Sequence, residues 1–226
     1  MQSFISETLD DILQTTNSFE NVLFVLPSQR AKVFVKQTFK DKISVGFLPE
    51  MLNIEQFIQE VSGVQKVDNI QLLFHFYTIY KSVEKNPDSF DTFSSWALTV
   101  LQDFNEIDQH LINSKDIFIY LRDIERLRKW SVKGTFKETE LMKDHYSFLE
   151  KLHTYYTAFY QFLIYENIGY QGLMYREASK KIDGFLKNNE SKKIFFIGFN
   201  ALNKAEELLF QKVLENGNSE IYWDID

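Results

Sequence analysis

The sequence predicts an α/β fold, in which a small parallel sheet is interrupted by a large all-helical insertion. Short apolar runs that suit buried strands occur only near the two ends of the 226-residue chain. Helical patterns separate these runs, which is typical of a parallel sheet with crossover helices. Residues 68–190 contain no convincing strand pattern. We therefore expect one discontinuous α/β domain, formed by residues 1–67 and 191–226, around a helical subdomain at 68–190.

The first elements follow from hydrophobic spacing. Residues 3–16 have an amphipathic helical pattern. Residues 21–26 form a continuous apolar run that a proline ends, as expected for a strand buried on both faces. Ser28 is a suitable N-cap for the next helix. The apolar positions of that helix are Val33, Phe34, Val35 and Phe39.

The middle of the chain is predicted to be helical. Residues 43–53 predict a loop with a short extended piece, followed by a helix that Gly63 ends. Residues 69–80 are apolar almost all round, so we expect a helix at the centre of a bundle. Further helical patterns occur at 93–111, 148–162 and 173–187.

Strand patterns return near the end of the chain. Residues 194–197 and 219–225 are the two runs, and a helix at 205–214 separates them. Three parallel strands make a narrow sheet, and no residues follow the last strand to cover its open edge. Because the edges of parallel sheets are normally covered, we expect this chain to be a fragment of a longer protein.

Composition limits the possible partners and location. The formal net charge of −7 argues against nucleic-acid binding by bulk electrostatics, although a local basic patch remains possible. No apolar run approaches the ~20 residues of a membrane helix, so we expect no membrane partner. The chain contains no cysteine, which excludes disulfides and thiolate-bound metals and is consistent with a cytoplasmic location.

Four short motifs give the sequence a family resemblance. The motifs LPS-R, DFNEID, Y-G-YREA and GFNALN-AE lie at Leu26–Arg30, Asp103–Asp108, Tyr170–Ala178 and Gly198–Glu206. Residues 22–39 and 193–226 resemble the N-terminal region of AddB-like proteins, which are degenerate superfamily I helicase subunits with a PD-(D/E)XK nuclease at their far C-terminus. The four motifs resemble more closely a shorter version found in Bacteroidetes-type bacteria.

The resemblance implies a helicase-like domain and a segment that contacts DNA. In the related helicases the loop after this first strand contacts the backbone of single-stranded DNA, and helix N-termini favour phosphate on general grounds. The candidate contacts here are Ser28, Gln29, Arg30, Lys32 and Lys36. An equally good interpretation is that Arg30 pairs with a nearby acid and the two lysines are merely solvated. The resemblance also implies a helicase–nuclease partner subunit.

Nucleotide chemistry is not expected in this chain. A phosphate-binding loop needs glycines followed by Lys and Ser/Thr, but no Gly-Lys dipeptide occurs and no glycine precedes residue 46. The resemblance places Gly198 and Phe199 where an active relative holds Mg²⁺ with an acidic pair. We therefore expect no ATP hydrolysis and no cofactor.

One group of side chains could in principle bind a metal, but another interpretation is better. Asp103, Glu106 and His110 lie within two helical turns and can in principle bind a metal. The solvated face of a helix is the better interpretation, and His75 is expected to be a core histidine. We therefore expect no metal.

The sequence thus predicts a non-catalytic, helicase-like scaffold region of a DNA repair or recombination protein, whose longer parent would carry the nuclease. The first alternative is a helical protein–protein interaction module with no role on DNA. A second, weaker alternative is a small-molecule enzyme that uses the strand ends.

Overall fold

The computed structural model describes residues 3–16, 18–43, 47–120 and 140–224, and between 140 and 150 it describes only Phe148 beyond the backbone. The chain forms two compact units. Met1–Gly63 and Met174–Asp226 make an α/β unit, and Val64–Leu173 make a helical unit. The sequence-based division lies at 67/68 and 190/191; the compact units instead divide at 63/64 and 173/174.

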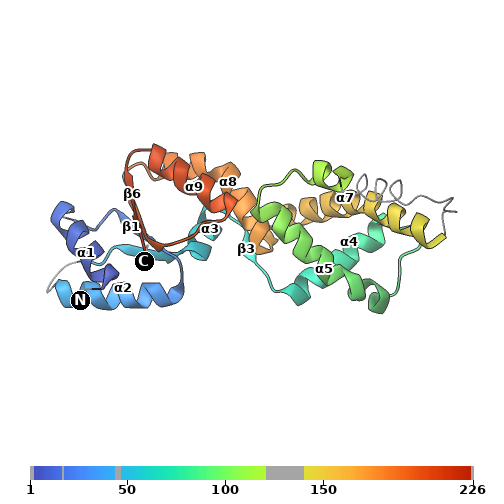
Figure 1. Ribbon diagram of the computed structural model, residues 1–226, viewed down its shortest axis with the longest axis horizontal. Coiled ribbons are helices and arrows are strands. Elements are labelled where there is room, and N and C mark those ends of the chain that lie inside the picture. Colours follow the sequence, from blue (N-terminus) through green and yellow to red (C-terminus); the bar gives the residue numbers. More distant parts are fainter. Residues whose placement is uncertain (1–2, 17, 44–46, 121–139, 225–226) are drawn as a thin grey trace, which may run out of the picture. The chain divides into compact units, whose positions relative to one another are not determined.

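The α/β unit is built on one parallel sheet (Figure 1). Its strands are β1 (Val22–Leu26), β2 (Glu50–Asn53), β5 (Lys193–Phe199) and β6 (Ser219–Trp223), in the order β2-β1-β5-β6. Every neighbouring pair is parallel. The α/β class and the parallel pairing of the three predicted strands are therefore confirmed.

The sheet has a fourth strand, which lies in the segment predicted as a loop with a short extended piece. β2 pairs with β1, with Met51 opposite Phe24. Only Met51 and Asn53 of its four residues are buried, and Glu50 is exposed. Such a short strand with alternating burial presents no apolar run, so the prediction of three strands was wrong.

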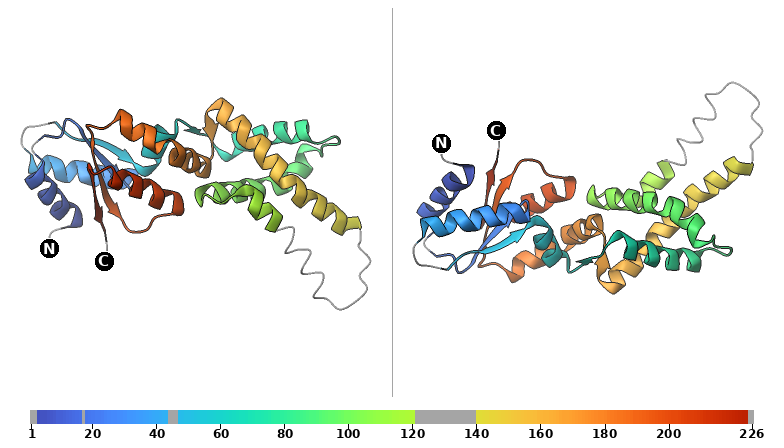
Figure 2. Two further views of the ribbon diagram at one scale, coloured as in Figure 1. Left: turned by 90° about the horizontal axis from the view of Figure 1, so that it is seen from above. Right: turned by 90° about the horizontal axis from the view of Figure 1, so that it is seen from below.

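Helices cover both faces of the sheet (Figures 1 and 2). One face packs against α1 (Phe4–Thr15) and α2 (Gln29–Lys42), and its core contains Phe24, Phe39 and Phe195. On the other face the ring of Phe196 stacks on Phe210, with 3.8 Å between centroids. The helices of that side are α3 (Ile54–Ser62), α8 (Gln171–Asn188) and α9 (Lys204–Glu215).

Local capping fixes where several of these helices begin and end. Ser28 and Asn53 are the N-caps of α2 and α3, as predicted. Gly63 ends α3 with φ of 67°, a left-handed conformation that favours glycine. Asn203 and Glu206 form a capping box at the start of α9.

The four apolar residues noted for α2 do not share one face. Val35 and Phe39 lie four residues apart and are both buried against the sheet. Val33 and Phe34 precede Val35 by two and one positions, which rotates them about 200° and 100° around the helix. Their side chains are accordingly 66% and 52% exposed.

The helical unit contains α4 (Asn69–Val83), α5 (Phe90–Gln109), α7 (Glu140–Glu166) and a further helical stretch at 114–120. Two short strands, β3 (Gln65–Lys66) and β4 (Ile168–Gly169), pair in parallel. Apart from β4 and the turns between helices, the described residues of 68–190 are helical, as the periodicity predicts. An aromatic core that includes Phe76, Phe93, Phe104 and Phe159 holds the helices together.

One helix of this unit is less buried than predicted. α4 packs against α5 and α7, and Leu72, Phe76 and Tyr80 enter the core. Ile70 and Phe74 lie on another side of α4 and are 68% and 55% exposed. The prediction that α4 is buried on all sides was therefore wrong, because its contacts with α5 and α7 leave one side uncovered.

Within the ranges that the structure describes, no helix combines the length and the apolar character that crossing a membrane requires.

Candidate nucleic-acid interface

The candidate interface lies where β1 passes into α2. All four strands are parallel, so their carboxyl ends share one edge of the sheet, the edge at which ligands bind in open α/β folds. Pro27 and Ser28 connect β1 to α2 at this edge. The Ser28 hydroxyl accepts a hydrogen bond from the Ala31 N–H at 3.1 Å, so its oxygen caps the helix while its own proton remains available to an acceptor. Gln29 is exposed.

Arg30 is exposed one turn before Phe34. Its Cζ atom lies 5.6 Å from the centroid of the Phe34 ring, which is within the range of a cation–π contact. No carboxylate of the described residues forms an ion pair with Arg30. The sequence left open the interpretation that Arg30 pairs with a nearby acid. The described part of the chain contains no such ion pair.

The two candidate lysines occupy different environments. Lys32 is half-buried, and its Nζ atom lies 3.5 Å from Oε1 of Gln56 at the start of α3. Lys36 is exposed, as is Lys40 one turn further along α2. Lys36 and Lys40 are one turn apart on an exposed flank of α2, about 120° and 80° around the helix from Arg30, whereas Lys32 partly links α2 to α3.

The charge of α2 is opposite to that of the whole protein. The helix carries five basic side chains and one acidic one, with no acid in its first turn. One of the five, Lys42, is neutralised by Asp10 at 2.6 Å. The remaining cations make a local basic strip on a chain whose net charge is −7. Composition alone could not reveal this strip, because it averages over the acidic remainder.

Val33 and Phe34 lie beside Arg30 on the exposed side of α2. Residues 30, 33 and 34 are neighbours on a helix surface because they are three and four positions apart. The sequence identifies Val33 and Phe34 only as apolar positions of this helix. It could not separate them from Val35 and Phe39, because it does not show which apolar positions the sheet covers.

The strand end at Gly198 and Phe199 has a structural role. Gly198 has φ of 81°, a backbone conformation that a carboxylate-bearing residue adopts only with strain. The buried ring of Phe199 packs edge-on against Phe210, with 4.9 Å between centroids. Neither side chain offers a ligand for Mg²⁺, and Asn200 beyond them is exposed.

The motif that begins at Asp103 lies in the helical unit. Glu106 and His110 approach to 3.4 Å between Oε2 and Nε2. Burial raises the pKa of Asp103, and the nearby Glu106 carboxylate raises it further. Both acids line a cavity of about 730 Å³ between α4 and α5. The described residues contain no group of three or more side chains placed to hold a metal ion, and His75 lies beside Phe162.

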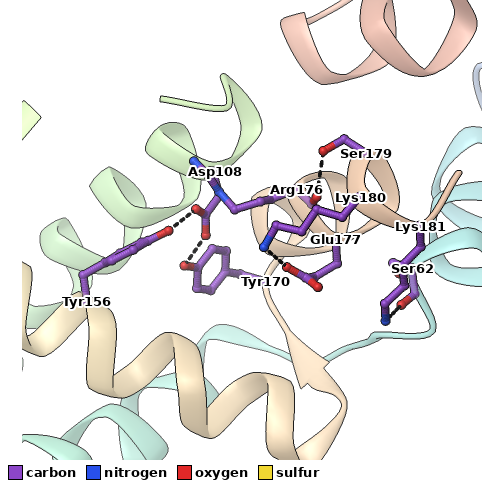
Figure 3. A network of polar contacts seen from close by, with 9 residues as sticks. All are labelled: Ser62, Asp108, Tyr156, Tyr170, Arg176, Glu177, Ser179, Lys180 and Lys181. Carbon is purple, nitrogen blue, oxygen red and sulfur yellow. Dashed lines mark hydrogen bonds and ion pairs between the residues drawn. The ribbon is translucent and has the colours of Figure 1, made fainter. Parts of the chain in front are cut away.

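Two of the four motifs meet in a buried network of the helical unit (Figure 3). Asp108 is fully buried and accepts hydrogen bonds from the hydroxyls of Tyr156, at 2.5 Å, and Tyr170, at 2.6 Å. Asn105 accepts a hydrogen bond from the Gly172 N–H at 2.8 Å. Residues of DFNEID therefore hold the start of Y-G-YREA in place.

The other motif contacts lie in the α/β unit. The Tyr175 hydroxyl donates to Oε1 of Glu206 at 2.6 Å, which joins α8 to the capping box of α9. Outside the motifs, Lys181 donates to the Ser62 carbonyl oxygen at 2.5 Å and so fixes the end of α3 (Figure 3). The motif contacts build the fold, whereas Ser28, Gln29 and Arg30 are exposed at the start of a basic helix.

The chain matches no protein-family model and has no significant match among curated proteins.

Proposed function

We propose that this chain is a non-catalytic, helicase-like scaffold region of an AddB-like DNA repair or recombination protein in the cytoplasm, and that α2 contacts single-stranded DNA weakly. The parallel sheet supports a helicase-like core, and the contacts that join DFNEID, Y-G-YREA and GFNALN-AE support the origin of these three motifs in one family pattern. The observation that carries the DNA contact is Arg30, which is exposed at the start of a basic helix and forms no ion pair with the described residues.

The contact uses few charges. Arg30 offers a phosphate a charge-assisted and potentially bidentate partner, and Lys36 adds a point charge two turns along the helix. Lys32 contributes less, because it is half-buried and lies near Gln56. About three phosphate contacts at ~0.7 each give a salt slope near 2 in log affinity. Binding is therefore weak, insensitive to sequence, and strongest at low salt.

The test is a charge reversal that preserves the fold. Arg30→Glu with Lys36→Glu reverses the charge of two exposed side chains of α2. The matched control is Lys85→Glu with Lys115→Glu, which changes the net charge equally at two exposed positions of the helical unit. Fluorescence anisotropy with a labelled oligothymidylate at low salt should show binding by wild type and control, and none by the α2 variant. Equal loss in both variants would indicate a bulk charge effect and contradict the proposal.

A second candidate function is supported by α4. Ile70 and Phe74 lie one turn apart, and both are more than half exposed. The Phe74 ring stacks on Phe90 with 5.2 Å between centroids, which holds it in place on the surface. Such a preformed apolar pair fits a helical protein-interaction module, and the partner would be a helicase–nuclease subunit. If wild type fails to bind DNA even at low salt, this function is the better one.

A further inference from the structure

The exposed face of α2 combines cations with an aromatic ring in a way that phosphate binding alone does not require. Phe34 is 52% exposed and Val33 is 66% exposed. Scattered apolar residues are normal on protein surfaces. Here, however, the two lie beside each other and next to Arg30, on the most basic helix of the α/β unit.

The Phe34 ring also has a charged neighbour on the same helix, the Arg30 side chain. The Arg30 guanidinium lies 5.6 Å from its centroid, so the two side chains are within cation–π range of each other on the helix surface. Both groups are planar, and both stack favourably on nucleobases. A base can insert against either plane without any movement of the backbone, because the pair is built from one helical turn.

We propose that Arg30, Val33 and Phe34 form a stacking platform for one unpaired base, so that this face selects single strands over duplex. The inference rests on the proposed function, since the phosphate contacts deliver the strand to the platform. Bases of a duplex are stacked on their neighbours, and only an unpaired base offers a free face to Phe34. The platform therefore adds selectivity that the cations cannot supply, because phosphates are present in both forms of DNA.

An anionic membrane surface is the competing partner for a basic helix with exposed apolar residues. A helix that lies in a membrane interface needs a broad apolar face. In α2 the apolar residues Val35 and Phe39 are buried against the sheet, so Val33 and Phe34 are the large apolar side chains of this helix that could face lipid. This area is too small for stable insertion but is sufficient for one base.

The test replaces Phe34 and leaves every charge in place. Stacking of one base on an aromatic side chain is worth about 1–3 kcal/mol. Because the ring is only half exposed, we expect Phe34→Ala to weaken single-strand binding by at least about 5-fold, with the salt slope unchanged. Phe34→Trp should restore binding. The matched control, Tyr165→Ala, removes an aromatic side chain that is 82% exposed in the helical unit and should have no effect.

A second readout reports stacking itself. An oligonucleotide that contains 2-aminopurine should lose fluorescence on binding to wild type, and it should lose less on Phe34→Ala at equal saturation. Duplex DNA of the same length should bind more weakly than the single strand, with equal affinity for wild type and Phe34→Ala.

The outcomes separate this inference from the proposed function. If charge reversal at Arg30 and Lys36 abolishes binding while Phe34→Ala binds normally, the DNA contact stands and the platform is wrong. Equal affinity for duplex and single strand would also overturn the platform. Binding to phosphatidylserine vesicles that exceeds DNA binding and depends on Phe34 would favour the membrane. If charge reversal has no effect, the proposed function itself fails.

Discussion

At the scale of single residues, the structure separates positions that pack from positions that remain available. Asp108 is one of the acidic residues of the DFNEID motif. Its carboxylate is fully buried and accepts hydrogen bonds from two tyrosine hydroxyls, so it stabilises the helical unit. Arg30, in contrast, forms no ion pair with the described residues and is the better candidate for function.

Gly172 illustrates how strictly such motif positions are packed. A Cβ atom at this position would lie 2.1 Å from the Asn105 carbonyl oxygen, which is backbone and cannot move aside easily. We predict that Gly172→Ala destabilises the protein by about 1–3 kcal/mol or more, as overpacked sites do. Urea denaturation followed by circular dichroism measures this change.

The control for that prediction lies in the same helix. A Cβ atom at Gly184 would meet nothing within 4 Å. Gly184→Ala should therefore raise the free energy of unfolding by about 0.5–1 kcal/mol, the usual gain from replacing glycine inside a helix. A loss of stability in Gly184→Ala, or none in Gly172→Ala, would contradict this account of α8.

At the scale of elements, side chains at the ends of helices join one helix to another. Glu84 is the C-cap residue of α4, and it joins α4 to α7 through Lys151 at 2.7 Å and Tyr155 at 2.5 Å. Burial alone would raise the pKa of Glu84. The hydrogen bonds from Lys151 and Tyr155, together with the charge of Lys151, outweigh burial and hold the pKa below its ordinary value.

This lowered pKa predicts a pH-dependent contribution to stability. A carboxyl group whose pKa is depressed in the folded state stabilises the protein above the unfolded pKa and loses this contribution as pH falls through the folded pKa. Glu84→Gln should therefore be less stable than wild type at pH 7, and the difference should shrink as pH falls below the ordinary value of 4.5. Thermal unfolding from pH 7 to pH 3 measures it.

An exposed ion pair supplies the comparison. Lys204 and Glu207 approach to 2.9 Å, but both side chains are more than half exposed. Glu207→Gln should change stability little at any pH, because surface ion pairs contribute little. A pH-independent effect of Glu84→Gln would show that packing, and not charge, is responsible.

The sequence predicts those elements whose apolar residues form a long continuous or regular pattern, and it misses elements whose pattern is short. β1 and β5 are continuous apolar runs and are found where expected, whereas β2 is too short and too alternating to be recognised. The exposed side of α4 and the exposed Phe34 could not be predicted either, because a pattern of apolar residues does not say which of them a neighbouring element covers. The site residues Ser28, Gln29 and Arg30 are at the predicted strand end, but their solvent exposure is known only from the structure.

At the scale of the whole molecule, charge and packing are distributed unequally. The net charge is −7, yet α2 is strongly basic, while α5 carries acids and no basic side chain. The motif contacts stabilise each unit internally. On our proposal the chain provides a framework and one polar face, without a reaction centre of its own.

The absence of nucleotide chemistry is a prediction of this proposal. Phe199 is buried beside Phe210, and the loop after β1 contains Pro27 and Ser28 in place of a glycine-rich phosphate cradle. We predict that isothermal titration calorimetry detects no binding of ATP with Mg²⁺. Saturable binding in the micromolar range would require a site that these residues do not form.

The most direct test of the central claim is the salt dependence of DNA binding. The affinity of wild type for an oligothymidylate, measured by anisotropy at several low salt concentrations, should give a slope of log affinity against log salt of about −2. The Lys85→Glu, Lys115→Glu control should give the same slope, and Arg30→Glu with Lys36→Glu should not bind. A wild-type slope near zero, or a slope and affinity that the α2 reversal leaves unchanged, would contradict the claim that this face contacts the phosphates of single-stranded DNA.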